Sequence, residues 1–247
     1  NKMDRMGANF YNDLKSIHDR LTSSAHPIQL PIGAAETFSG IIDLFEMKAE
    51  IYKDDLGTKF EESEVPADEL ERAKEFRAKL VEAIVETDEV LMEKYLAGEE
   101  IPVVDLKKAL RKAVIANKIV PILCGSALKN KGVQFILNAV AEYLPSPIDI
   151  DPPLGSDVDD EEKKIEIKVD DSAPLSGLAF KIATDPFVGK LVFYRVYSGV
   201  LKSGSYIVNN STGNKERIGR ILRMHSNSRE EVDEVYAGEI AAIVGIR

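Results

Sequence analysis

The sequence predicts an α/β region followed by an all-β region. Up to about residue 147, apolar residues recur at helical spacing, and these patterns alternate with short apolar runs typical of strands. Residues 148–174 are rich in Pro, Gly and acidic side chains, which is typical of a linker. From Leu175 onward, apolar and polar residues alternate in short, closely spaced stretches with Gly at the turns. That pattern favours a small β-barrel over residues 175–247.

The α/β region is expected to open with a helix over residues 6–22, where four apolar residues lie at helical spacing: Phe10, Leu14, Ile17 and Leu21. Pro66 is expected to start a long helix, because its missing N–H costs nothing in a first turn. Asp88 is expected to restart that stretch as a second helix and Gly98 to end it. The other expected elements are strands over 27–32, 41–44, 49–52 and 119–124, and helices over 103–117 and 133–144.

The all-β region is expected to contain strands over 178–183, 191–197, 206–208, 217–224 and 239–246. Ser203 and Gly204 form the expected hairpin turn before the third of these strands. In the linker, the alternation over 165–169 predicts one edge strand. The acidic run over 157–162 is expected to be a solvated surface, because it lacks the fixed spacing of a metal site.

Three arginines, Arg217, Arg220 and Arg223, fall three residues apart in the last part of the chain. A flat strand would distribute them over both faces, whereas a bulge or a strong twist would gather them. Gathered arginines would form an RNA contact, and the alternative is that all three are ordinary exposed side chains. The sequence leaves both possibilities open.

Charge is distributed unevenly along the chain, whose formal net charge is −10. Residues 175–247 hold 10 Lys and Arg against 7 Asp and Glu, and residues 1–174 hold 22 against 35. The acidic whole argues against DNA, whereas the basic last part keeps RNA possible. The single cysteine, Cys124, excludes an internal disulfide and is expected to be a buried structural thiol. No apolar run approaches a membrane span and no signal peptide begins the chain, so a cytoplasmic protein is expected.

Two short segments carry the expected chemistry: Asn1-Lys2-Met3-Asp4 and Gly125-Ser126-Ala127. A carboxylate at Asp4 can accept hydrogen bonds from the N1–H and the amino group of guanine, a donor pair that adenine lacks. Asn1 would bond the base and brace the loop, and the Lys2 stem would cover one face of the ring. Backbone N–H groups near Ser126 and Ala127 would point at the guanine O6 atom. Because the second segment follows a strand expected to be buried and parallel, it lies where open α/β sheets bind ligands.

The first segment could instead be a polar turn before a helix. No G-x-x-x-x-G-K-[ST] loop is present, so no segment of this sequence can cradle phosphates. The run Asp54-Asp55-Leu56-Gly57 fits the D-x-x-G of a switch segment, but it follows the first motif and lies in what looks like a polar hairpin. The sequence therefore looks like the second half of a nucleotide-binding domain joined to another domain.

Longer stretches of the chain resemble bacterial elongation factor G, a ribosomal translocase. The stretches that carry the resemblance are Asn1-Lys2-Met3-Asp4-Arg5, Cys124-Gly125-Ser126-Ala127, Lys129-Asn130-Lys131-Gly132-Val133, Asp185-Pro186-Phe187-Val188-Gly189-Lys190, Tyr194-Arg195-Val196-Tyr197-Ser198-Gly199, Arg223-Met224-His225 and Arg229-Glu230-Glu231-Val232. The resemblance implies a partial P-loop-type GTPase domain over 1–27 and 119–147, an α+β inserted subdomain over 28–118, a linker over 148–174 and a truncated second-domain barrel over 175–247.

The resemblance also implies a function. The parent protein would be a GTPase that binds GTP or GDP with Mg²⁺ and acts on the ribosome in translation elongation. The inserted subdomain would contact the ribosomal stalk protein, and the barrel would contact ribosomal RNA. The family's P-loop, switch segments and catalytic histidine precede its N-K-x-D, so this chain alone would hydrolyse no GTP, bind no nucleotide tightly and hold no metal. His18, His26 and His225 match no catalytic position.

Alternatives remain within and outside this family. Release factor 3 and the tetracycline-resistance protein are related translational GTPases that the same motifs would fit. A free-standing acidic adaptor, built from a helical module and a barrel with no nucleotide role, is the alternative of another class. The inserted region before Gly125 favours the GTPase.

Overall fold

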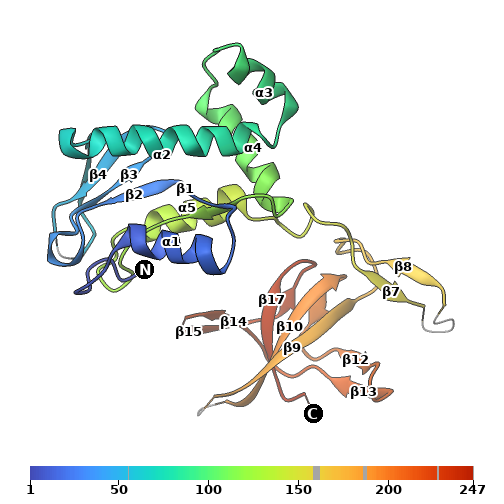
Figure 1. Ribbon diagram of the computed structural model, residues 1–247. Coiled ribbons are helices and arrows are strands. Elements are labelled where there is room, and N and C mark those ends of the chain that lie inside the picture. The colour runs from blue at the N-terminus through green and yellow to red at the C-terminus, as the bar shows by residue number, and fades with distance from the viewer. Residues whose placement is uncertain (55, 158–161, 186–187, 227, 247) are drawn as a thin grey trace. The chain divides into compact units, whose positions relative to one another are not determined.

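The computed structural model describes residues 1–54, 56–157, 162–185, 188–226 and 228–246. These residues form two compact units, Asn1–Pro145 and Ser146–Arg247, which are described separately (Figure 1). Among the described residues, no helix has the length and apolar character needed to cross a lipid bilayer.

The first unit contains five α-helices and six strands among its described residues. The helices are α1 (Phe10–Arg20), α2 (Ala67–Val85), α3 (Glu89–Leu96), α4 (Val103–Ile115) and α5 (Val133–Tyr143). The strands are β1 (Ala25–Pro27), β2 (Gln29–Ile32), β3 (Gly40–Asp43), β4 (Lys48–Tyr52), β5 (Phe60–Glu64) and β6 (Val120–Ile122), and a short 3-10 helix spans Ala35–Thr37.

The strands of the first unit form two sheets. β1 pairs in parallel with β6, and β2, β3, β4 and β5 form an antiparallel sheet in that order. The single strand expected over 27–32 is therefore wrong, because the chain changes sheets at Ile28. The Ile28 N–H donates to Ile122 O (3.0 Å), whereas its carbonyl accepts from the Leu44 N–H (3.1 Å). One residue thus connects the two sheets.

A single hydrophobic core fills the first unit. It joins side chains from α1 to α5 with those of the four-stranded sheet, and its fully buried members include Leu30, Ile41, Leu80 and Leu110. α2 packs against β1, α3 and α4, and α4 packs against α5 (Figure 1). Burial of these apolar side chains is the main driving force that holds the helices on the sheets.

The ends of α1 and α3 are set by the residues that cap them. α1 begins at Phe10 and not at Met6, because the Asn9 side chain accepts hydrogen bonds from the N–H groups of Tyr11 (3.1 Å) and Asn12 (3.0 Å). The restart at Asp88 is confirmed: its carboxylate accepts from the Leu91 N–H at 3.2 Å at the start of α3. Gly98 follows α3 with a positive φ of 75°.

The strand expected over 119–124 is parallel as predicted, but it is not buried as a whole. Val120 is 43% exposed, and β6 has β1 as its only paired strand among the described residues. Cys124 is buried, and burial raises the pKa of its thiol to about 12. The prediction of a buried structural thiol is therefore confirmed.

The second unit is all-β. Its strands are β7 (Leu154–Ser156), β8 (Lys164–Glu166), β9 (Ser176–Asp185), β10 (Gly189–Ser198), β11 (Leu201–Lys202), β12 (Tyr206–Asn209), β13 (Asn214–Arg217), β14 (Ile221–His225), β15 (Ser228–Val232), β16 (Glu234–Val235) and β17 (Ile240–Val244). The main sheet has the order β15-β14-β17-β10-β9, and small two-stranded sheets pair β7 with β8, β11 with β16 and β12 with β13.

Pairing within the main sheet differs from the sequence expectation at its end. A barrel truncated as the resemblance implies would leave the strand over 239–246 with a free apolar edge. β17 instead lies inside the sheet, where it pairs with β10 on one side and β14 on the other. Ala241, Ala242 and Ile243 are consequently buried. Among the described residues, β9 and β15 are the edges of this sheet.

Two further segments of the second unit depart from expectation. The strand expected over 217–224 is two strands in different sheets, because the chain turns at residues 218–220 between β13 and β14. In the linker, β8 covers only the start of the edge strand expected over 165–169. Part of the acidic run over 157–162, together with Asp55, Pro186 and Phe187, lies outside the described residues.

Candidate functional site

The fold brings the two predicted motifs into direct contact. The Ala127 N–H donates to Asn1 Oδ1 at 3.1 Å, and the Met3 N–H donates to Gly125 O at 3.1 Å. Asn1 Oδ1 also accepts from the Lys2 N–H at 2.7 Å, while Lys2 adopts a positive φ of 66°. The side chain of Asn1 therefore braces the loop that the second motif forms.

Asp4 and Ser126 form the polar centre of this junction. A hydrogen bond from the Ser126 side chain is the main cause that holds the pKa of Asp4 below its ordinary value, and the positive charges of Arg5 and Lys129 act in the same direction. Ser126 is only 1% exposed, and its Oγ also accepts from the Lys129 N–H at 3.3 Å. Asp4 is thus an ionised carboxylate held in place by a buried hydroxyl, which suits a ligand that offers N–H donors.

The loop after Gly125 is closed by its own backbone. The Ser126 N–H donates to Lys131 O (2.8 Å), and the Lys131 N–H donates back to Ser126 O (3.0 Å). A Cβ on Gly125 would lie 2.5 Å from Lys131 O, so only glycine fits there. Because the N–H groups of Ser126 and Ala127 are both bonded within the protein, neither is left open for O6 as the sequence led us to expect.

A small cavity of about 140 Å³ lies beside this loop. Asn1, Ser126 and Ala127 line it together with residues of the β6–α5 connection, whereas Lys2 and Asp4 do not. The structure thus places the five predicted base-binding residues in one region, with Lys2 and Asp4 outside the cavity itself.

The sequence missed one residue that supports the loop. The Gly132 N–H, at the start of α5, donates to the buried Tyr52 hydroxyl at 2.7 Å. The apolar pattern places Tyr52 on a strand, but no sequence signal points to this partner 80 residues away.

The described residues of the D-x-x-G match, 54, 56 and 57, lie in the turn between β4 and β5, as its polar surroundings suggested. The Asp54 carboxylate accepts hydrogen bonds from the Thr58 N–H (3.0 Å), the Thr58 hydroxyl (2.5 Å) and the Lys59 N–H (3.1 Å). These bonds close the turn between β4 and β5.

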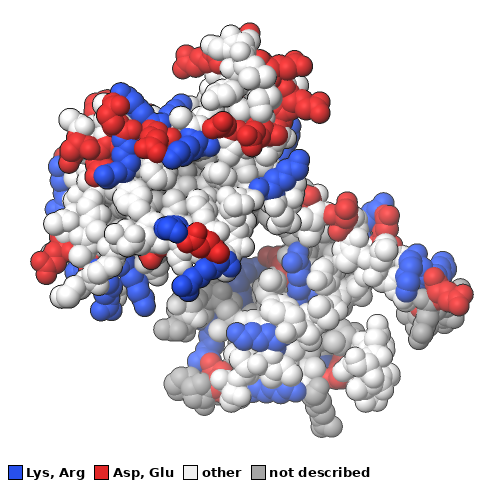
Figure 2. Space-filling model, in the orientation of Figure 1, with Lys and Arg blue, Asp and Glu red and all other residues white. Residues whose placement is uncertain are grey.

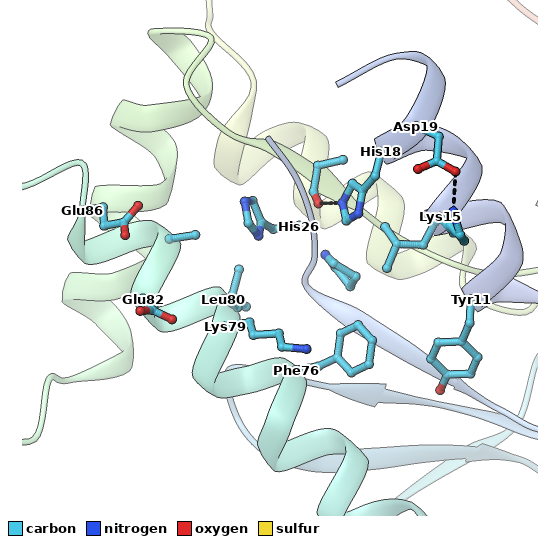
Figure 3. Close-up of a pocket in the computed structure, with 14 residues that line it drawn as sticks. Tyr11, Lys15, His18, Asp19, His26, Phe76, Lys79, Leu80, Glu82 and Glu86 are labelled. Carbon is cyan, nitrogen blue, oxygen red and sulfur yellow. Dashed lines mark hydrogen bonds and ion pairs between the residues drawn. The ribbon is translucent and has the colours of Figure 1, made fainter. Parts of the chain in front are cut away.

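A larger hollow of about 560 Å³ lies between α1, β1 and α2, away from both motifs (Figure 3). His18 and His26 line it. His18 Nε2 lies 2.7 Å from Ala25 O, and burial lowers the pKa of His26. Both histidines therefore lie within the first unit, in the wall of this hollow. Among the described residues, no group of three or more His, Cys, Asp or Glu side chains could hold a metal ion.

The three arginines of the second unit are not gathered on one strand. Arg217 is on β13, in a different sheet from β14. Arg223 lies 3.4 Å from Glu239, and Arg220 lies 4.0 Å from Glu231. The register of β14 shows no bulge among the described residues. The bulge that would have gathered these side chains is therefore absent there, and two of the three arginines have acidic neighbours.

Comparison with known proteins identifies two families along the chain. Residues 1–146 match the family described as elongation factor Tu GTP binding domain, and residues 189–247 match elongation factor Tu domain 2. A crystal structure of a protein from Thermus thermophilus matches 96% of this chain with a TM-score of 0.72 and 32% sequence identity. This chain spans 32% of that protein's chain. The predicted fold class, a GTPase-type α/β domain followed by a barrel-type second domain, is confirmed.

Proposed function

The chain belongs to the family of the elongation factor Tu GTP binding domain, and on that premise we propose that it recognises guanine in a translational GTPase of the elongation factor G type. The observation that carries this proposal is the contact of the two motifs, in which the Ala127 N–H donates to Asn1 Oδ1 and the Met3 N–H donates to Gly125 O. A polar turn before a helix would need neither contact.

Recognition would depend on the charge of Asp4. Its ionised carboxylate would accept the N1–H and amino donors of guanine, and the exposed Lys2 stem would cover the ring. The O6 atom would take its hydrogen bond from the Ala127 N–H, which would then share or exchange its present partner, Asn1 Oδ1. Adenine would be rejected for two reasons. Its 6-amino group is a donor and would face the Ala127 N–H, which is also a donor, and its N1 carries no proton that Asp4 could accept.

Phosphate and Mg²⁺ binding are not part of this site. Because no phosphate-binding loop is present in the sequence, we assign no residue to these groups and expect no GTP hydrolysis by this chain alone. In a longer protein, hydrolysis would be coupled to work on the ribosome in translation elongation.

Two surfaces would contact the ribosome. Glu82, Glu86, Glu89 and Glu93 are exposed around the end of α2 and on α3, and none forms an ion pair among the described residues. Acidic side chains gather around α3 in Figure 2. This face would repel phosphate backbones, so its partner would be a protein, for which the stalk protein is our proposal. The RNA contact would be the barrel, because residues 175–247 hold 10 Lys and Arg against 7 Asp and Glu.

Nucleotide titration followed by ¹⁵N NMR tests guanine recognition directly. GDP should shift the amides of Met3, Ser126 and Ala127, whereas ADP at the same concentration should not. Equal shifts with both nucleotides, or none with GDP at millimolar concentration, would contradict the proposal. An acidic adaptor, the alternative of another class, has no specific observation in its favour.

A further inference from the structure

A hairpin of the inserted region reaches the guanine loop at a buried hydrogen bond. Tyr52 ends β4, is 7% exposed, and accepts the Gly132 N–H at 2.7 Å. Gly132 comes directly after Lys131, whose backbone closes the loop around Ser126. It also precedes α5, where first-turn N–H groups lack partners within the helix. Loss of the hydroxyl would therefore leave a buried donor unsatisfied.

The tip of the same hairpin holds the loop at a second point. Asn130 Nδ2 donates to Gly57 O at 3.3 Å. A Cβ on Gly57 would lie 2.5 Å from the carbonyl oxygens of both Lys129 and Asn130. Gly57 also has a positive φ of 61°, which disfavours other residues. The tip and the loop thus touch backbone to backbone, so that a side chain at residue 57 would displace one of them.

Lys131 adds a third contact between these segments. Its Nζ lies 3.4 Å from Phe38 O and 5.8 Å from the centre of the Tyr52 ring. The second half of the loop, residues 129–132, is consequently held by residues 38, 52 and 57. Asp4 lies on the other motif, and no group of the hairpin is among the causes that lower its pKa.

We propose that Tyr52 and Gly57 are positioning residues for guanine binding, because the β4–β5 hairpin fixes the loop that faces the O6 edge of the base. This inference rests on the proposed function. It separates two halves of the site: Asp4 would read the N1 and amino side of the base, and the hairpin would act on the O6 side.

Three diphosphates distinguish the two halves in NMR titrations of the whole chain. GDP carries both O6 and the amino group, IDP carries O6 alone, and the 2-aminopurine riboside diphosphate carries the amino group alone. The variant is Tyr52→Phe, which keeps the ring. Its matched control is Tyr143→Phe, which removes the hydroxyl of another buried tyrosine in the same core.

Tyr52→Phe should weaken the binding of GDP and of IDP by the same factor, roughly three- to tenfold, as expected for the loss of one neutral hydrogen bond. It should leave the 2-aminopurine compound unchanged. Gly57→Ala should produce the same pattern, and Tyr143→Phe should change none of the three affinities. Hydrogen exchange at the Gly132 amide should accelerate in Tyr52→Phe.

Two outcomes would overturn the inference: equal weakening of all three ligands, which indicates a general loss of structure, or unchanged Gly132 exchange and unchanged affinities. If wild-type chain bound no GDP, the proposed function would fail by itself. Gly132 exchange would still decide whether the hairpin holds the loop.

Discussion

Asn1 and Ala127 are 126 residues apart in the sequence, and Asn1 Oδ1 accepts the Ala127 N–H at 3.1 Å. This bond joins the first residue of the N-K-x-D segment to the last residue of the G-S-A segment. An asparagine suits the position, because its amide oxygen can accept from Ala127 and Lys2 together. The same amide keeps two donors for a ligand.

Asp4→Asn should reverse the base preference of the site from guanine to xanthine. The substitution exchanges one acceptor for a donor, which matches the C2 carbonyl of xanthine. Loss of the paired charged hydrogen bonds should cost about 2–4 kcal/mol of guanine affinity. NMR titrations with GDP and XDP measure this change. Unchanged GDP affinity would show that Asp4 does not read the base.

Ser126→Ala should raise the pKa of Asp4 toward 3.8, because the substitution removes the main cause that lowers it. A carboxyl whose folded pKa is lowered contributes stability above its unfolded pKa and loses it as the pH falls through the folded value. In wild-type protein this contribution should therefore disappear only below pH 3.8, and in the variant it should be smaller throughout. A ¹³C NMR titration of the Asp4 carboxyl measures both midpoints. Equal midpoints would exclude the Ser126 bond.

Asn9→Ala should fray the start of α1. The Asn9 side chain satisfies the N–H groups of Tyr11 and Asn12, and loss of such a cap costs about 1 kcal/mol. Hydrogen exchange at these two amides should accelerate several-fold, whereas Asn210→Ala, at an exposed position of the second unit, should leave them unchanged. Unaltered exchange in Asn9→Ala would show that other groups cap this helix.

Hydrogen exchange should be slow in β17 and fast along the free side of β9. Ala241, Ala242 and Ile243 are buried between two paired strands, whereas Phe180 is 50% exposed on an edge strand. If this chain self-associates, Phe180→Lys should reduce the association, because charge blocks edge pairing. Sedimentation velocity measures this, with Tyr206→Lys on β12 as the control. Rapid exchange throughout β17 would contradict its central place.

Gly177→Ala should destabilise the second unit by about 1–3 kcal/mol, the usual cost of an over-packed core. The added Cβ would lie 2.3 Å from the ring of Tyr194, a buried residue of the neighbouring strand β10. Urea unfolding of the second unit measures the cost. Combining the substitution with Tyr194→Leu should recover part of it, and strict additivity of the two changes would exclude the clash.

Local patterns were sufficient to predict most of the elements. The spacing of apolar residues located every α-helix of the first unit, and the Asp88 cap was predictable because a cap acts within one turn. Boundaries were less accurate: the pattern extended α1 to Met6, which is 95% exposed, because apolar spacing continues beyond the Asn9 cap. The apolar spacing and the Asn9 cap are both local signals, and the sequence alone did not show which of them sets the start of the helix.

What the sequence determined by itself is the set of residues proposed for the site: an aspartate, an asparagine and a small-residue loop, whose hydrogen-bonding groups complement guanine when they lie together. Only the tertiary structure decided their supports. In the folded chain, Ser126 lowers the pKa of Asp4, and the Tyr52 hydroxyl accepts the Gly132 N–H. β14 is the second strand that pairs with β17. The physical reason is that a side chain's hydrogen-bond partner and a strand's neighbour come from segments far away in the chain. The spacing of apolar residues along the chain predicts which side chains are buried, but it does not predict which residues they contact.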